Sequence, residues 1–129
     1  MAFELKIQNE IIFLTFSDES DIKSLLRGNR EILNIPNYKS SYPMIVNLSD
    51  CDFSNLTIQD IQQYIDSMVD VADKLPTVIA YVVIRDMEFG MVRTYAAMAD
   101  DRLTAERQLF RDVDSAISWV NSKKQTQDS

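Results

Sequence analysis

Hydrophobic and polar positions alternate in a way that predicts five β-strands. In residues 3–7, apolar side chains alternate with charged ones, the pattern of a strand with one buried face. Residues 11–16 form a second, more apolar strand, and the polar residues 8–10 between the two favour an antiparallel hairpin. Three further strand-like runs follow at residues 44–48, 77–84 and 104–110. The run 77–84 is apolar on both sides, which predicts a strand buried on both faces of a sheet.

Four segments with helical periodicity separate or follow these strands. Thr57 is expected to cap the clearest helix, with Asp60 at its third position, and Pro76 is expected to stop it. Asp112 is expected to cap the last helix, and polar residues in 17–21 can cap the first. The apolar stripes of the four helices fall within residues 22–33, 58–75, 88–99 and 113–120.

The predicted order of elements is β-β-α-β-α-β-α-β-α. Right-handed crossovers make strands two to five parallel, and the hairpin makes the first strand antiparallel to the second. We therefore predict a single layered α/β domain with a mostly parallel five-stranded sheet. The domain is expected to occupy residues 1–122, and residues 123–129 are expected to form a disordered polar tail.

The composition limits the classes of molecule that the protein is expected to bind. A net charge of −7 argues against binding to a nucleic-acid backbone, which requires clustered basic residues. No apolar run approaches the length of a membrane span, so no membrane insertion is expected. No signal peptide is visible, and the single cysteine, Cys51, forms no internal disulfide. We therefore expect a cytoplasmic protein.

The chain contains no histidine. This excludes Ser-His-Asp and Cys-His hydrolases and every zinc site that needs imidazole, and one cysteine is too few for a thiolate cluster. Asp50, Asp52 and Asp60 are oxygen ligands suited to a hard cation, but their spacing fits no EF-hand and a solvated acidic loop is the default. We expect a protein that is not an enzyme and that has neither cofactor nor metal.

The last third of the chain carries a family resemblance. Residues 89–95 (Phe-Gly-Met-Val-Arg-Thr-Tyr), 110–112 (Phe-Arg-Asp) and 116–120 (Ala-Ile-Ser-Trp-Val) resemble the C-terminal signature of the SpoIIAA-like family. These are small bacterial domains of unsettled role, grouped by fold with STAS regulators and with lipid-binding CRAL-TRIO domains. The resemblance implies a STAS/SpoIIAA-like fold.

In sporulation-type STAS regulators, a serine between the third strand and the second helix is phosphorylated by a partner kinase. By position, the resemblance implies Ser54 as the matching residue, with Thr57 as a second choice. The chain departs from the regulators' pattern because Asn47 replaces an aspartate and no glycine follows the serine. The alternative interpretation is that Ser54 and Thr57 are capping residues.

A ligand crevice is expected where the buried strand meets the next helix. Ligands of open α/β sheets bind outside the carboxyl ends of the strands. Gly90 is expected at the helix start, with Arg85 and Arg93 beside the crevice and Phe89 and Tyr95 close to it. The alternative is that Gly90 allows close packing of helix on strand and that Arg93 forms a salt bridge.

Two functions follow from these observations. The favoured one is a regulatory or binding module that acts through protein–protein contact, as a homodimer or with another protein, using the surface around residues 49–57. The alternative is a carrier or sensor of an apolar or amphipathic, lipid-like molecule held between the sheet and its helices near residues 89–95. Methionine and aromatic side chains suit such a cavity, although at helical spacing they equally suit an ordinary core.

Overall fold

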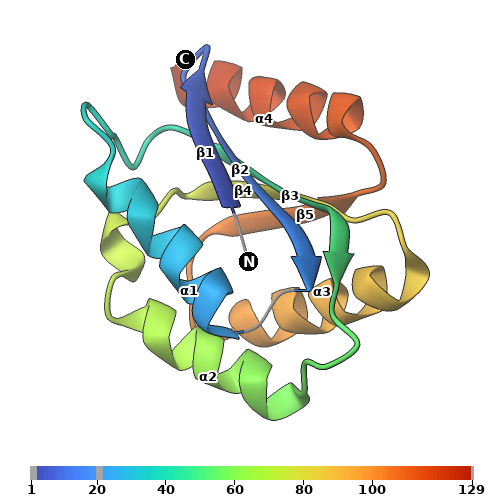
Figure 1. Cartoon of the computed structure of the whole chain (residues 1–129). Coiled ribbons are helices and arrows are strands. Elements are labelled where there is room, and N and C mark those ends of the chain that lie inside the picture. The colour runs from blue at the N-terminus through green and yellow to red at the C-terminus, as the bar shows by residue number, and fades with distance from the viewer. Residues whose placement is uncertain (1–2, 20–21, 129) are drawn as a thin grey trace.

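A five-stranded sheet forms the centre of the computed structural model, which describes residues 3–19 and 22–128 (Figure 1). The strands are β1 (Phe3–Gln8), β2 (Ile11–Glu19), β3 (Met44–Asp52), β4 (Val78–Val82) and β5 (Glu106–Phe110). The helices are α1 (Ile22–Glu31), α2 (Ile58–Val69), α3 (Asp86–Ala99) and α4 (Val113–Asp128), with short 3-10 helices η1 (Ile32–Asn34) and η2 (Ala72–Lys74). This order of elements confirms the predicted fold class.

The strands lie side by side in chain order. β1 pairs antiparallel with β2, and β2 to β5 are mutually parallel, as predicted. The hairpin between β1 and β2 turns at Asn9 and Glu10, whose φ angles are 54° and 62°. Two consecutive positive φ angles are typical of a type I′ turn, which matches the twist of the strands it joins. The amine of Lys124, from α4, donates a hydrogen bond of 2.9 Å to the carbonyl of Asn9 and ties the turn to the last helix.

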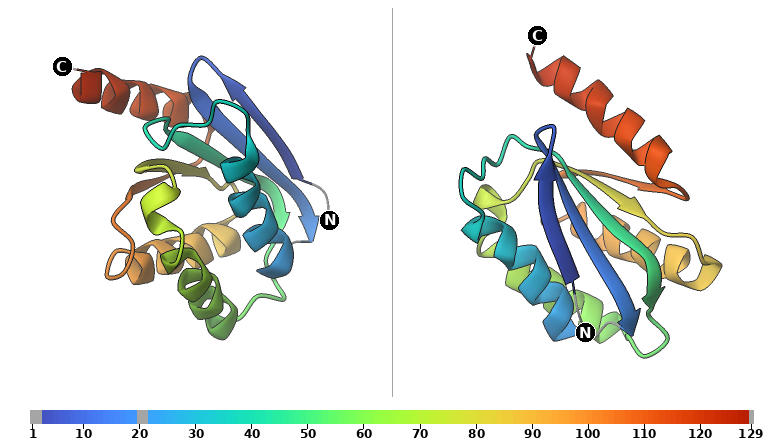
Figure 2. Two further views of the ribbon diagram at one scale, coloured as in Figure 1. Left: turned by 90° about the vertical axis from the view of Figure 1, so that its left-hand side faces the viewer. Right: turned by 45° about the horizontal axis from the view of Figure 1, so that its top comes forward.

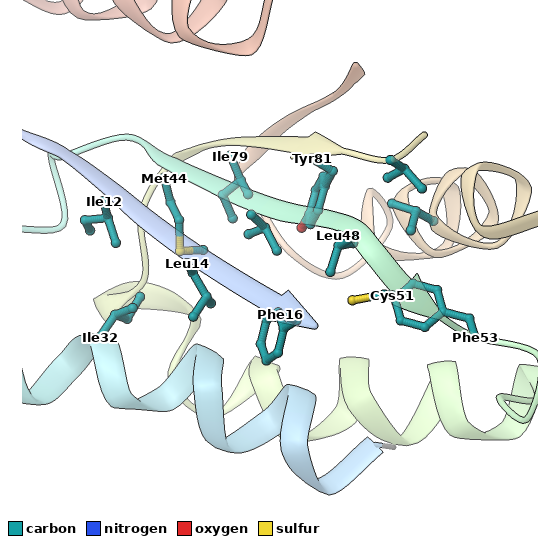
Figure 3. Close-up of a cluster of buried hydrophobic side chains, with 13 residues drawn as sticks. Ile12, Leu14, Phe16, Ile32, Met44, Leu48, Cys51, Phe53, Ile79 and Tyr81 are labelled. Atoms are coloured by element: carbon teal, nitrogen blue, oxygen red, sulfur yellow. The ribbon is translucent and has the colours of Figure 1, made fainter. Parts of the chain in front are cut away.

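Three helices cover one face of the sheet and the fourth covers the other. Figure 2 shows α1, α2 and α3 on one side, with α4 alone on the opposite side. The core under α4 comes from β2, β3 and β4 and is completed by Ala116 and Val120. The larger core faces the other three helices and contains ten labelled side chains in Figure 3, among them Leu14, Phe16 and Tyr81.

Strand β4 is buried on both faces, as the apolar run predicted. All five residues from Val78 to Val82 are buried, because alternate side chains enter the two cores. The strand lies between β3 and β5 and is not a border strand. It ends earlier than expected, and Ile84, inside the predicted run, is 53% exposed.

Strand β3 is longer than predicted, and residues 49–52 are strand rather than loop. Between β2 and β3 the register passes from Thr15↔Asn47 to Ser17↔Asp50, so β3 carries one extra residue at this point. Such a bulge shifts the side-chain alternation by one position. The residues of β3 that face the larger core therefore change from even to odd numbers, and after the bulge Cys51 and then Phe53 are buried there.

Helix α1 packs so closely on β2 that only glycine fits at one position. A Cβ atom on Gly28 would lie 2.5 Å from Cζ of Phe16, a ring that is fully buried. Phe16 points from the end of β2 toward α1 (Figure 3). Gly28 weakens the intrinsic helix propensity, but it permits this contact.

Helix boundaries differ from the predictions at several ends. α2 ends at Val69 because the chain turns there before η2, so the stripe expected to reach residue 75 is interrupted. α3 begins at Asp86, four residues before Gly90. α4 reaches Asp128, beyond the expected domain boundary at residue 122. Residues 20 and 21, expected among the caps of the first helix, lie outside the described residues, as does residue 129 of the expected tail. None of the helices in residues 22–128 is long and apolar enough to cross a membrane.

Candidate functional site

Two loops meet at the edge of the sheet where β3 and β4 end. Arg85, just before α3, donates from Nε and Nη2 to the carboxylate of Glu88, at 3.0 and 2.9 Å. Oε2 of this carboxylate, which accepts from Arg85 Nη2, also accepts the backbone N–H of Phe53, in the loop after β3, at 3.0 Å. Arg85 Nη2 also lies 3.6 Å from Asp52 Oδ1. These contacts fix the β3–α2 loop against the start of α3.

Glu88 is the electrostatic centre of this arrangement. Glu88 is only 1% exposed, whereas the Arg85 side chain is half exposed. Hydrogen bonds from Arg85 hold the pKa of Glu88 below its ordinary value. Desolvation opposes this shift, and the hydrogen bond from the Phe53 N–H adds to it. The pKa of Arg85 is raised, first by its hydrogen bonds to Glu88. Glu88 is therefore a carboxylate at neutral pH, with its charge compensated inside the fold.

Apolar side chains are exposed beside this ionic contact. Ile84 is 53% and Met87 48% exposed, on the β4–α3 loop and the first turn of α3. Ile58, the first residue of α2, is 54% exposed next to the β3–α2 loop. We call the surface made by Ser54, Asn55, Ile84 and Met87 the loop face.

Arg111 holds the β4–α3 loop from the opposite direction. Its Nη1 donates to the carbonyl of Ile84 at 2.7 Å and to Oδ1 of Asp86 at 2.9 Å. Its guanidinium lies 4.0 Å from the ring centroid of Phe89, within the range of a cation–π contact. The apolar residues of the loop face therefore stand on a segment that is fixed from both sides.

The structure separates the two predicted phosphosites by their environment. Ser54 is exposed, its backbone N–H donates to Oδ1 of Asp52 at 2.9 Å, and its hydroxyl also contacts that carboxylate. These two hydrogen bonds lower the pKa of Asp52. Thr57 caps α2: its hydroxyl accepts the N–H of Asp60, and the Asp60 carboxylate accepts the N–H of Thr57. The predicted capping box is confirmed, and the hydroxyl of Thr57 is engaged in it.

The residues predicted to flank a crevice do not gather in one place. Gly90 is exposed inside α3, and no atom lies within 4 Å of a Cβ placed there, so it allows no close packing of helix on strand. Arg93 is exposed as well. Arg85 and Phe89 belong to the contacts of the β4–α3 loop described above. Tyr95 alone lines an apolar cavity.

That cavity has a volume of about 70 Å³ and lies between the sheet and helices α1, α2 and α3. Its walls are almost entirely carbon, with Phe16 and Tyr81 from the sheet and Leu25 from α1 among them. Tyr64 from α2 and Tyr95 from α3 line it as well. A drug-sized ligand needs roughly 300 Å³ or more, so this space holds only a small group.

Sequence reasoning missed Glu88, which the structure makes the link between the two loops. A glutamate in the first turn of a helix is common on exposed surfaces, and nothing local distinguishes a buried one. The only local signal was its position three residues after Arg85, which allows an ion pair on one helical turn.

No group of three acidic or cysteine residues within the described ranges is arranged to hold a metal ion. Asp50, Asp52 and Asp60, which suit a cation by residue type, do not form such a group. Asp52 is directed to Ser54 and Arg85, and Asp60 caps α2.

Comparisons with known proteins identify the fold. No family model matches the sequence, and no curated protein matches it. Among solved structures, the chain is similar to an uncharacterized protein of the DUF3478 family from Shewanella loihica PV-4, described as having a SpoIIAA-like fold. The match has a TM-score of 0.60 at 10% sequence identity and covers 92% of each chain. The chain has a SpoIIAA-like fold.

Proposed function

We propose that this protein is a non-enzymatic regulatory or binding module that acts through protein–protein contact at the loop face. The observation that supports this most directly is the exposure of Ile84 and Met87 on a segment held by the contacts of Arg85 with Glu88 and of Arg111 with Ile84 and Asp86. Exposed apolar side chains on a rigid support lose little conformational entropy when a partner covers them. The partner surface should therefore offer apolar side chains to Ile84 and Met87, and a second copy of the chain meets this requirement as well as another protein does.

Ser54 is the residue at which such contact would be regulated. It is exposed at the rim of the loop face, while the alternative residue, Thr57, already uses its hydroxyl as a cap. A phosphate on Ser54 would meet the Asp52 carboxylate, which repels it, and Arg85, which attracts it. Phosphorylation would therefore change the charge of the loop face where a partner contacts it.

The proposal is tested by placing a charge on the loop face. Ile84→Asp and Met87→Asp should reduce binding of the partner, or of a second copy, because a carboxylate would be buried without a counter-charge. Val69→Asp is the matched control, because Val69 is also an exposed apolar residue but lies at the far end of α2. Quantitative cross-linking with mass spectrometry and sedimentation velocity measure the two kinds of association. Equal association by all three variants would exclude the loop face.

The charge effect of phosphorylation is tested separately with Ser54→Asp. We expect this variant to keep the circular dichroism and melting temperature of the parent and to change its association. An unchanged association profile would remove the regulatory role of Ser54 while leaving the loop face as an interaction surface.

A second function, a carrier of an apolar molecule, is supported by the cavity between the sheet and α1–α3. At about 70 Å³ the cavity does not hold a lipid-like chain unless the helices rearrange. Native mass spectrometry of the purified protein, compared with denatured mass, would reveal a retained ligand. The carrier function predicts an additional mass in the native state that disappears on denaturation.

A further inference from the structure

We propose that Arg107 and three neighbouring tyrosines bind the carboxylate of a short-chain aliphatic acid, whose carbon chain enters the adjoining apolar cavity. The four side chains come from four elements: Tyr64 from α2, Tyr81 from β4, Tyr95 from α3 and Arg107 from β5. This site is separate from the loop face; it specifies the ligand class of the carrier function proposed for the same cavity and rests on that proposal.

Arg107 occupies a strand position whose neighbours are apolar. It is paired in register with Ile79, and both Ile79 and Leu109 pack into the core below α1–α3. The side chain is partly buried, yet no carboxylate of the described residues forms an ion pair with it. Its Nε is buried without a hydrogen-bond partner. A partly buried cation with an unused donor has an unfavourable free energy, which a bound anion would relieve.

The tyrosines supply neutral hydrogen-bond donors beside this cation. The hydroxyl oxygens of Tyr81 and Tyr95 lie 3.3 Å apart, and the guanidinium carbon of Arg107 lies 6.0 Å from the Tyr95 ring centroid. Only one of the two hydroxyl protons can lie between the oxygens, so the other can be donated to an acceptor. Burial, reinforced by the neighbouring Tyr95, raises the pKa of Tyr64 and Tyr81 well above ordinary values, so both remain protonated at neutral pH.

Arg107 keeps its positive charge in this setting. Desolvation acts to lower its pKa, but Tyr81 and Tyr95, whose hydroxyl oxygens also accept hydrogen bonds from the guanidinium, outweigh this effect, and the pKa lies above its ordinary value. One of its terminal nitrogens, Nη1, donates to the carbonyl of Ala105 at 2.8 Å, which fixes the direction of the guanidinium. The guanidinium fork suits a planar carboxylate with a single charge better than it suits a phosphate dianion, which one arginine neutralises only in part.

The cavity sets the length of the carbon chain. Tyr64, Tyr81 and Tyr95 line the cavity and Arg107 does not, so the carbon chain would lie in the cavity while the carboxylate lies beyond it, beside the tyrosine hydroxyl groups and Arg107. A dry cavity of about 150 Å³ holds the six carbons of benzene. On that scale, 70 Å³ accommodates roughly three carbons. A carboxylate with a three-carbon chain, such as butyrate, is the matching ligand.

The first test compares butyrate with its neutral amide. Isothermal titration calorimetry of the full chain should show butyrate binding at least about tenfold more tightly than butyramide, the ratio expected for one charge-assisted hydrogen bond. Octanoate and inorganic phosphate should bind more weakly than butyrate. No binding by butyrate, or equal binding by butyramide, would overturn the site. Tighter octanoate binding would overturn the size argument, and equal phosphate binding would overturn the choice of a carboxylate.

Variants locate the binding. Arg107→Gln should lose at least about tenfold in butyrate affinity, whereas Arg93→Gln, on an exposed part of α3, should bind like the parent. Tyr95→Phe keeps the ring and removes the hydroxyl; it tests the site even if Arg107→Gln does not fold, and it should weaken butyrate more than butyramide. Amide chemical shifts in the parent should change around Tyr95 and Arg107 when butyrate is added. Unaltered affinity in both site variants would refute the assignment.

Discussion

Replacing Glu88 with glutamine removes the buried negative charge that joins the two loops. The carboxylate accepts two hydrogen bonds from Arg85 and one from the Phe53 N–H. A glutamine at this position presents one oxygen and one NH₂ group, so at least one of the donors facing it loses its acceptor. An unsatisfied buried donor costs about 1–3 kcal/mol, and a hydrogen bond to a charged group contributes about 1.5–3 kcal/mol. Arg85 is half exposed and recovers hydration, so we expect a net loss of about 2 kcal/mol at pH 7.

Asp86→Asn is the matched control. Asp86 lies on the same helical turn and is also paired with an arginine, Arg111, but its side chain is 95% exposed. Exposed ion pairs contribute about 0–1 kcal/mol, so the control should stay close to the parent. Urea unfolding followed by circular dichroism and by the fluorescence of the single tryptophan, Trp119, gives both values.

The pH dependence provides an independent check. The pKa of Glu88 is lower in the folded chain than in the unfolded chain, so its charge stabilises the fold fully above the unfolded value, near 4.3. This contribution is lost as the pH falls through the lowered folded value. The stability difference between the parent and Glu88→Gln should therefore shrink below about pH 4. A difference that is near zero at pH 7, or that does not change with pH, would refute this account of Glu88.

Three further predictions concern the scaffold. Gly28→Ala should destabilise the protein by about 1–3 kcal/mol in urea unfolding, because the new methyl group overlaps Phe16. Gly90→Ala, where the space is open, should instead stabilise the protein by about 0.5–1 kcal/mol. Equal effects of the two substitutions would contradict the packing described. Thr57→Ala should lose about 1 kcal/mol, and Thr57→Ser should retain most of the stability; equal losses would argue against the cap. Burial raises the pKa of Tyr38 to about 12. The contribution of the Tyr38 side chain to stability is therefore present below about pH 10 and is lost as the pH rises toward 12. Tyr38→Phe should remove that part of the alkaline dependence of stability, measured by chemical unfolding between about pH 9 and 12.

Local patterns determined the order of elements and the layers of this protein. Three predictions that rest on local patterns were confirmed. They are the alternation of apolar and polar residues in β1, the burial of β4 on both faces and the cap of α2 at Thr57. The extension of β3 was not predicted, because a bulge exchanges inward and outward positions and makes a buried strand look like a polar loop. The role of Gly28 was likewise invisible, because it depends on the Phe16 ring of another element.

The sequence by itself therefore determined which segments form strands and helices, since that information is carried by periodicity within each segment. Only the tertiary structure decided which side chains meet. It brings Glu88 to the Phe53 N–H across 35 positions of the chain and places Arg107 beside Tyr81 and Tyr95. The predicted crevice residues were chosen because they follow the buried strand at the carboxyl end of the sheet, but α3 begins before Gly90, and both Gly90 and Arg93 are exposed. Contacts between elements depend on strand register and on the rotation of each helix about its axis. A shift of one residue, such as the β3 bulge, moves the following side chains to the opposite face of the strand.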